Sequence, residues 1–264
     1  MIVLDNLSVM LGGKTIVDGV TLDTPAGSFS AIVGPSGSGK TTLLRSLAGE
    51  LPYLGSVKIA GKEVSGLTAS QQAALRGVLP QASYVAFPFT VREVVMLNGA
   101  ASSHEGGRAE QERLLTELLS RVGLKDFAGR RYAELSGGEM QRVQLARVLF
   151  QIGDPNPQHS AKWLLLDEPV SSLDIRHQNQ ILQLAAQFAE AGGGVVAIMH
   201  DLNLTANFAD QVFMMNSGRL IAHGPARECM TSGNVSRVFE CGLTGGRPPT
   251  GDVPFILPHS AQLS

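Results

Sequence analysis

The sequence feature that most constrains the fold is a glycine-rich loop between an apolar run and a helix-like segment. The apolar run is Phe29–Val33, and Leu43, Leu44 and Leu47 follow the loop at helical spacing. The loop, residues 34–41, reads Gly-Pro-Ser-Gly-Ser-Gly-Lys-Thr and satisfies the pattern G-x-x-x-x-G-K-[S/T]. Between a strand and a helix, this pattern indicates a phosphate-binding loop and an α/β core.

Each residue type in the loop has a physical reason to be there. Glycine allows positive φ and lets the backbone approach an anion without a Cβ clash. The backbone N–H groups then form a concave nest at a helix N-terminus, which favours phosphate. Lys40 supplies a positive charge for the β- and γ-phosphates, and Thr41 supplies a hydroxyl for Mg²⁺. The expected nucleotide-binding residues are Gly34, Pro35, Ser36, Gly37, Ser38, Gly39, Lys40, Thr41 and Thr42.

The rest of the chain predicts a sheet flanked by helices. Residues 1–33 read as strands, whereas residues 85–150 carry helical patterns. Beyond them, the apolar segments WLLLD and VVAIM alternate with helical patterns at 175–190 and 203–209. Strands without polar positions indicate a parallel sheet that is covered on both faces.

Composition excludes several classes of protein. The chain has 264 residues, with 21 Lys and Arg against 23 Asp and Glu, so it lacks the basic footprint of a general nucleic-acid binder. The apolar runs are strand-length, far short of the roughly 18 residues of a transmembrane helix. The first basic residue is Lys14, which argues against a signal peptide. We expect a soluble, cytosolic protein that binds no nucleic acid and reaches a membrane only through a partner.

Two carboxylates and a histidine end the apolar strands that follow the loop. Asp167 and Glu168 come after WLLL, and His200 comes after VVAIM. Ligands bind at the carboxyl ends of parallel strands, so these side chains are expected near the phosphates. Asp167 suits Mg²⁺, Glu168 suits orientation of an attacking water, and His200 suits a γ-phosphate contact. Alone, each could be a solvated or structural residue, but the preceding phosphate-binding loop favours function.

Residues 135–142, Leu-Ser-Gly-Gly-Glu-Met-Gln-Arg, resemble the signature motif of ABC ATPases. The order phosphate loop, Gln81, LSGGE, LLLDEP, SSLD and His200 is similar to an ABC nucleotide-binding domain over about residues 1–240. The signature is a second helix N-terminus whose Ser136, Gly137 and Gly138 face a phosphate. In this family it acts on the nucleotide of a partner, so the resemblance implies a homodimer that holds ATP between one phosphate loop and the opposite signature.

The resemblance also implies individual roles. The implied catalytic residues are Lys40, Gln81, Glu168 (the base) and His200; the implied Mg²⁺ ligands are Thr41, Gln81 and Asp167; and the implied dimer-interface residues are Asp174 and Ser136. Two alternatives stay open. Gln81 could be an ordinary loop amide, and Asp174 could cap the helix at 175–190, with or without an interface role.

One position departs from the family pattern. ABC domains usually carry an aromatic ring for adenine just before the first Gly-Gly turn, whereas this chain has Leu11 there. We expect adenine to rest on aliphatic surface, provided by Leu11 with Val17.

Several stretches resemble the ATP-binding subunits of bacterial heme importers. They are residues 78–99, the polar loop 153–162, and residues 199–212 and 218–229. Iron-siderophore and vitamin B12 importers share the HDLN segment, so they remain alternatives. A non-transport ABC ATPase or an exporter subunit is less favoured, because the chain has a single phosphate loop and no fused membrane span.

This resemblance implies the assembly and the domain layout. The chain would bind ATP and Mg²⁺ and would sit at the cytoplasmic face of the inner membrane on two transmembrane permease subunits, served indirectly by a periplasmic substrate-binding protein. The fold would be an α/β P-loop NTPase core with a mixed, mainly parallel sheet and an N-terminal antiparallel β subdomain. Residues 1–243 would form the nucleotide-binding domain, with a helical subdomain inserted at about 85–150 and an extended tail at 244–264.

Overall fold

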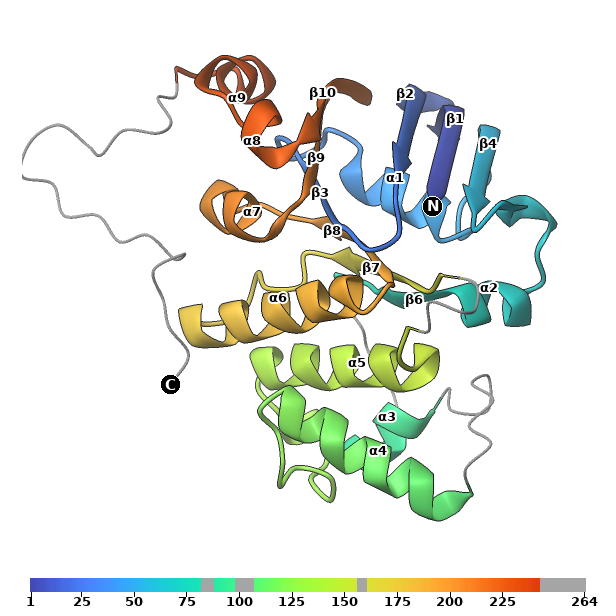
Figure 1. Cartoon of the computed structure of the whole chain (residues 1–264), viewed down its shortest axis with the longest axis vertical. Helices are drawn as coiled ribbons and strands as arrows, with labels where there is room; N and C mark the ends of the chain where they lie inside the picture. Colours follow the sequence, from blue (N-terminus) through green and yellow to red (C-terminus); the bar gives the residue numbers. More distant parts are fainter. Residues whose placement is uncertain (82–87, 98–106, 156–160, 243–264) are drawn as a thin grey trace, which may run out of the picture.

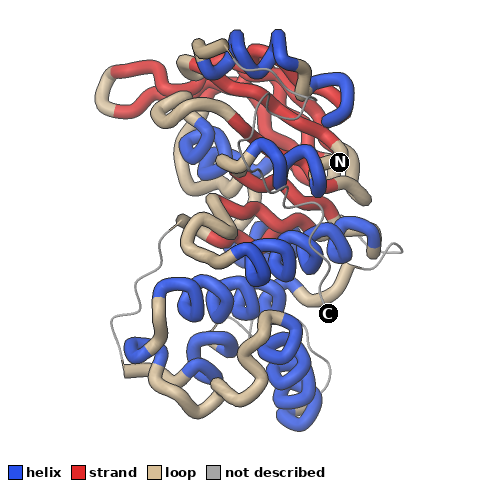
Figure 2. The backbone as a smooth tube through the Cα atoms, turned by 90° about the vertical axis from the view of Figure 1, so that its left-hand side faces the viewer, coloured by secondary structure: helices blue, strands red, loops and turns tan. Residues whose placement is uncertain are grey.

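The computed structural model describes residues 1–81, 88–97, 107–155 and 161–242. The antiparallel sheet and the mainly parallel sheet lie toward one end of the long axis of the molecule, and a group of helices forms the other end (Figure 1). Figure 2 shows the same order, with strands confined to the upper part and helices alone at the base.

The first sheet is built by the N-terminal strands. Its order is β2-β1-β4-β5, and all its pairs are antiparallel. The strands are β1 Ile2–Leu11, β2 Lys14–Thr24, β4 Leu54–Ile59 and β5 Lys62–Glu63. One face of this sheet is buried, which agrees with the alternation of apolar and polar residues along β1 and β2. The expected N-terminal antiparallel sheet is therefore confirmed.

The second sheet has the order β10-β9-β3-β8-β7-β6. Its neighbouring strands are parallel except for the pair β9 and β10. The strands are β3 Phe29–Val33, β6 Arg76–Leu79, β7 Trp163–Asp167, β8 Gly194–Ile198, β9 Gln211–Asn216 and β10 Arg219–Pro225. The expected α/β core with a mixed, mainly parallel sheet is confirmed.

The central strands β3, β7 and β8 are largely apolar and buried at every position, because each of their faces contacts a different core. Ile32 and Leu165 pack with the N-terminal sheet and with helix α1 (Lys40–Leu47). Leu164 and Leu166 belong to the other core, with the helices on the opposite face. Successive side chains of a strand point to opposite faces, so burial of both faces leaves little place for polar residues.

The helices of the inserted segment pack on one another. They are α3 Val91–Met96, α4 Arg108–Arg121 and α5 Gly137–Ile152, and both α3 and α4 contact α5. Helix α5 also packs against β6, so it connects this group of helices to the sheet (Figure 1). Further along the chain, α6 Ile175–Glu190 and α7 Leu202–Phe208 follow β7 and β8. The helices predicted at 175–190 and 203–209 are present, the first with the predicted ends and the second one residue earlier.

Some elements were not anticipated from the sequence. They are α2 Ala69–Leu75, strand β6, α8 Ala226–Cys229, α9 Ser232–Phe239 and two 3₁₀ turns at Val64–Gly66 and Tyr132–Glu134. The predicted extended tail at 244–264 lies outside the described residues, as do parts of the segments 78–99 and 153–162. No helix within the described ranges is long and apolar enough to cross a bilayer.

Candidate nucleotide-binding and hydrolysis site

The phosphate loop has a shape that only glycine permits at two positions. Gly34 has φ of +153°, and a Cβ there would lie 2.0 Å from the carbonyl oxygen of Met215. Gly39 caps α1 with φ of +97°, and its Cβ would lie 2.7 Å from the carbonyl oxygen of Ile16. The backbone of the loop is thus pressed against β2 and β9 at these two glycines, which leaves no room for a Cβ.

Two side chains of the loop are poised for an anion. Lys40 is 5% exposed, and its Nζ donates to the carbonyls of Gly34 and Pro35 at 2.9 Å each. Burial lowers the pKa of Lys40, while the carboxylates of Glu168 and Asp167 act in the opposite direction. The buried hydroxyl of Ser38 has no hydrogen-bond partner among the described residues. The Lys40 ammonium group and the unpaired Ser38 hydroxyl, both in the glycine-rich loop, are suited to bind a chain of phosphates.

The predicted Mg²⁺ ligands lie beside this loop. The Thr41 hydroxyl donates to Asp167 Oδ1 at 3.3 Å. Burial raises the pKa of Asp167, and the adjacent Glu168 carboxylate raises it further. Thr41, Gln81 and Asp167 line one cavity of about 320 Å³, with Leu44, Arg45, Glu50, Val78 and Pro80. These three side chains offer oxygen donors of the kind that Mg²⁺ prefers, and a cation would relieve the crowding of charge at Asp167.

Glu168 and His200 are brought together by the ends of two neighbouring strands. His200 Nε2 lies 2.6 Å from Glu168 Oε1, although the two residues are 32 positions apart in sequence. The Glu168 side chain is only 15% exposed, whereas that of His200 is 46% exposed. Glu168 has φ of +52°, a conformation that costs a residue with a side chain about 1–2 kcal/mol. Such strain is typical of a residue whose direction matters to function.

The predicted signature residues form the first turn of α5. Ser136 is the N-cap of this helix, and both Ser136 and Gly137 are exposed. The Glu139 carboxylate accepts from the Ser136 amide and hydroxyl at 2.7 Å each, which lowers the pKa of Glu139. The first turn of α5 is thus closed by a capping box, in which the Glu139 carboxylate occupies the amide and hydroxyl of Ser136.

The alternative capping role of Asp174 is present in the structure. Asp174 is the N-cap of α6, and its carboxylate accepts from the His177 amide at 2.9 Å. Its pKa is lowered by this bond and by the bond to the His177 ring. The side chain is 66% exposed, so an interface role stays a prediction beside the capping role.

The two residues predicted for adenine differ in exposure. Leu11 is 39% exposed, whereas Val17 has no exposed surface and belongs to the core under the N-terminal sheet. Only Leu11 of this pair offers a side-chain surface on which a base can rest. Val20, Leu22 and Thr24 alternate with exposed positions on β2, and an irregularity in the β1–β2 pairing between Val17 and Val20 brings Val17 into the same core.

One polar side chain near the site received no role from the sequence. Gln141, on α5, bonds both to the backbone of Glu168 and to the side chain of Ser172. It stands in the signature segment, but no pattern within one sequence connects it with residue 168. The contact arises from packing of α5 against the loop after β7.

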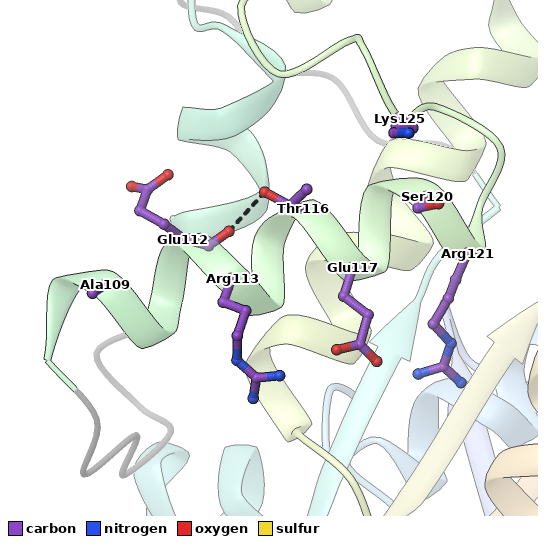
Figure 3. Close-up of a pocket in the computed structure, with 8 residues that line it drawn as sticks. All are labelled: Ala109, Glu112, Arg113, Thr116, Glu117, Ser120, Arg121 and Lys125. Atoms are coloured by element: carbon purple, nitrogen blue, oxygen red, sulfur yellow. Dashed lines mark hydrogen bonds between the residues drawn. The ribbon is translucent and has the colours of Figure 1, made fainter.

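A groove on α4 contains none of the predicted site residues. Its volume is about 700 Å³, and it follows the exposed face of the helix (Figure 3). The lining residues are Ala109, Glu112, Arg113, Thr116, Glu117, Ser120, Arg121 and Lys125. Positive and negative side chains alternate along it, as expected of a solvated helix face.

The chain is similar to known proteins over most of its length. A family model described as ABC transporter matches residues 17–171. A hemin import ATP-binding protein, HmuV, of Rhizobium johnstonii is 53% identical over 261 residues, covering 99% of this chain and 98% of the relative. HmuV of Rhizobium meliloti is 49% identical, and the alignment covers both chains completely.

Solved structures show the same fold. An ATP-binding subunit of an ABC transporter superposes with a TM-score of 0.76 at 21% identity, over 87% of this chain and 91% of that one. The ATP-binding cassette MJ0796, a dimer in a post-hydrolysis state with ADP and Pi, superposes with a TM-score of 0.74 at 25% identity, over 86% and 99%.

Proposed function

The chain belongs to the ABC transporter family as an ATP-binding subunit, and from that premise we propose that it energises the import of heme. The substrate is supported by the hemin import proteins that are about half identical to this chain over nearly its whole length. In the proposed assembly, the transported molecule passes through the permease and does not contact this chain. The proposal therefore concerns which permease this chain serves, and ATP is the ligand of the chain itself.

The observation that carries the hydrolytic role is the Glu168–His200 contact beside the phosphate loop. In the proposed mechanism, Lys40 and the loop N–H groups bind the β- and γ-phosphates. Glu168 takes a proton from the attacking water, and His200 holds that carboxylate and contacts the γ-phosphate. Mg²⁺, when bound at Thr41, Asp167 and Gln81, neutralises charge on the phosphates.

The proposed assembly is a homodimer on a membrane permease. Ser136, Gly137 and Gly138 of one copy bind the γ-phosphate of the nucleotide on the other, and Asp174 lies at the interface. Residues 1–243 act as the nucleotide-binding domain, with the helical subdomain at about 85–150. The dimer sits at the cytoplasmic face of the inner membrane on two permease subunits, supplied by a periplasmic binding protein.

Asp167→Asn is expected to separate folding stability from Mg²⁺ binding. The pKa of Asp167 is raised in the folded protein, so its charged form opposes folding, increasingly as pH rises through that pKa. Asparagine removes the charge and keeps an acceptor for Thr41. The nucleotide-free variant should therefore melt at a higher temperature than wild type at pH 7.5, with the difference shrinking as pH falls.

Mg²⁺ should raise the ATP affinity of the same variant at least about tenfold less than it raises that of wild type, because a proposed Mg²⁺ ligand is removed. Thermal melts and nucleotide titrations with and without Mg²⁺ measure both effects. Asp201→Asn is the matched control, because Asp201 caps α7 and lies outside the proposed ligand set. An unchanged Mg²⁺ dependence in Asp167→Asn would contradict its assignment as a ligand.

The substrate is tested in cells that lack this chain. Uptake of heme, of a ferric siderophore and of vitamin B12 is measured after complementation with wild type or with Glu168→Gln. Heme uptake that returns with wild type alone supports the proposal. Recovery of siderophore or B12 uptake instead would assign the chain to a sibling importer. Co-purification with ribosomes or DNA rather than with a permease would refute transport altogether.

A further inference from the structure

Gln141 joins two segments that the proposed mechanism treats separately. Its Nε2 donates to the carbonyl oxygen of Glu168 at 2.9 Å, and its Oε1 accepts from the Ser172 hydroxyl at 2.7 Å. Both ends of the amide are therefore engaged. A side chain with one donor and one acceptor so used has its orientation set by its partners.

The carbonyl that Gln141 holds belongs to a residue in an unfavourable backbone conformation. Glu168 has φ of +52°, and its carbonyl also accepts from the amide and the hydroxyl of Ser171, at 3.4 and 3.3 Å. The bond from Gln141 is the shortest of the three. An unfavourable backbone conformation persists only when surrounding contacts hold it in place. Here the hydrogen bonds to the Glu168 carbonyl are such contacts.

Gly138, in the first turn of α5, also packs closely against the segment that follows Glu168. A Cβ on Gly138 would lie 3.1 Å from the Leu173 side chain and 3.3 Å from the carbonyl oxygen of Ser172. The first turn of α5 therefore packs directly on the segment after Glu168. Gln141 supplies the polar part of this contact, so the direction of the Glu168 backbone depends on α5.

We propose that Gln141 is a positioning residue for hydrolysis. By fixing the Glu168 carbonyl and the Ser172 hydroxyl together, it sets the direction in which the Glu168 carboxylate leaves the strand end. This inference rests on the proposed function, in which Glu168 is the base. Gln141 does not touch nucleotide in this role, so its removal affects the chemical step rather than ATP binding.

The test is the isosteric Gln141→Glu in the full-length chain. A carboxylate at this position cannot donate to the Glu168 carbonyl, whereas it can still accept from Ser172. We expect kcat for ATP hydrolysis to fall by about 10- to 100-fold, as misplacement of a catalytic group does. The KM for ATP should stay within about threefold, since the binding groups are untouched. Ser172→Ala, which keeps the bond to Glu168, should lower kcat less than Gln141→Glu does.

Gln144→Glu is the matched control, because Gln144 lies on the same helix and donates to the Tyr132 hydroxyl instead. It should keep kcat within about threefold of wild type whatever its melting temperature. A Gln141→Glu variant with wild-type kcat, or an equal loss of kcat in Gln144→Glu, would overturn the positioning role. If wild type hydrolyses no ATP, or Glu168→Gln turns over normally, it is the proposed function that fails.

Discussion

Glu168→Gln is expected to abolish multiple-turnover ATP hydrolysis and to leave ATP binding intact. The exchange keeps the size of the side chain and its place beside His200, but removes the proton acceptor. Loss of a general base typically costs 10²–10⁴-fold in rate. Because ATP would then persist between the two copies, the variant should accumulate as an ATP-bound dimer. Steady-state phosphate release and size-exclusion chromatography with Mg·ATP measure the two effects.

Glu190→Gln makes the same chemical exchange at the exposed last residue of α6 and serves as the control. It should hydrolyse ATP and remain free of the trapped dimer. Normal turnover by Glu168→Gln would remove Glu168 from the role of base. Tight binding of ATP by separate monomers would instead refute the shared site.

Lys40→Ala is expected to weaken nucleotide binding strongly, by at least about tenfold. The ammonium group is the charged partner of the phosphates, and a hydrogen bond to a charged group contributes about 1.5–3 kcal/mol, or roughly 10- to 150-fold in affinity. The substitution also leaves the carbonyls of Gly34 and Pro35 without their donor. Titration with a fluorescent ATP analogue checks the affinity, and circular dichroism checks the fold.

Lys40→Met separates charge from packing, because it keeps most of the buried stem of a residue that is 5% exposed. It should bind as weakly as Lys40→Ala while melting closer to wild type. Lys62→Ala, on the exposed β5, should bind like wild type. Wild-type affinity in both Lys40 variants would count against the loop as the phosphate site.

The central strands of the second sheet were predictable from sequence, whereas the edge strand β6 was not. Strands β3, β7 and β8 are continuous apolar runs, because both faces of the sheet are covered. Strand β6 reads Arg-Gly-Val-Leu and carries no such signal. Its Gly77 is required by packing, since a Cβ there would lie 2.5 Å from the Val148 side chain on α5. That requirement comes from a residue 71 positions away, beyond the reach of local patterns.

The candidate site likewise contains residues that were predictable from sequence and residues that were not. Asp167, Glu168 and His200 could be placed near the phosphate loop, because each ends a strand whose carboxyl end faces the same edge of the sheet. The role of Gln141 and the burial of Val17 could not, since both depend on how one element packs on another. Motif spacing therefore points to the proposed reacting groups, whereas the contacts that support them need the three-dimensional structure.

In the proposed dimer, the capping box at Ser136 would affect how this helix end binds the nucleotide of the second copy. The Ser136 hydroxyl has a single proton, and Glu139 already accepts it. For that hydroxyl to donate to a phosphate, its hydrogen bond to the Glu139 carboxylate must first break. Binding of a phosphate would therefore exchange one anionic acceptor for another. This exchange would contribute little net free energy to binding, because the hydrogen bond that forms resembles the one that breaks. In the proposed dimer, the free energy of closure would therefore come mainly from other contacts of the interface, and Ser136 would contribute to the choice of ligand more than to affinity.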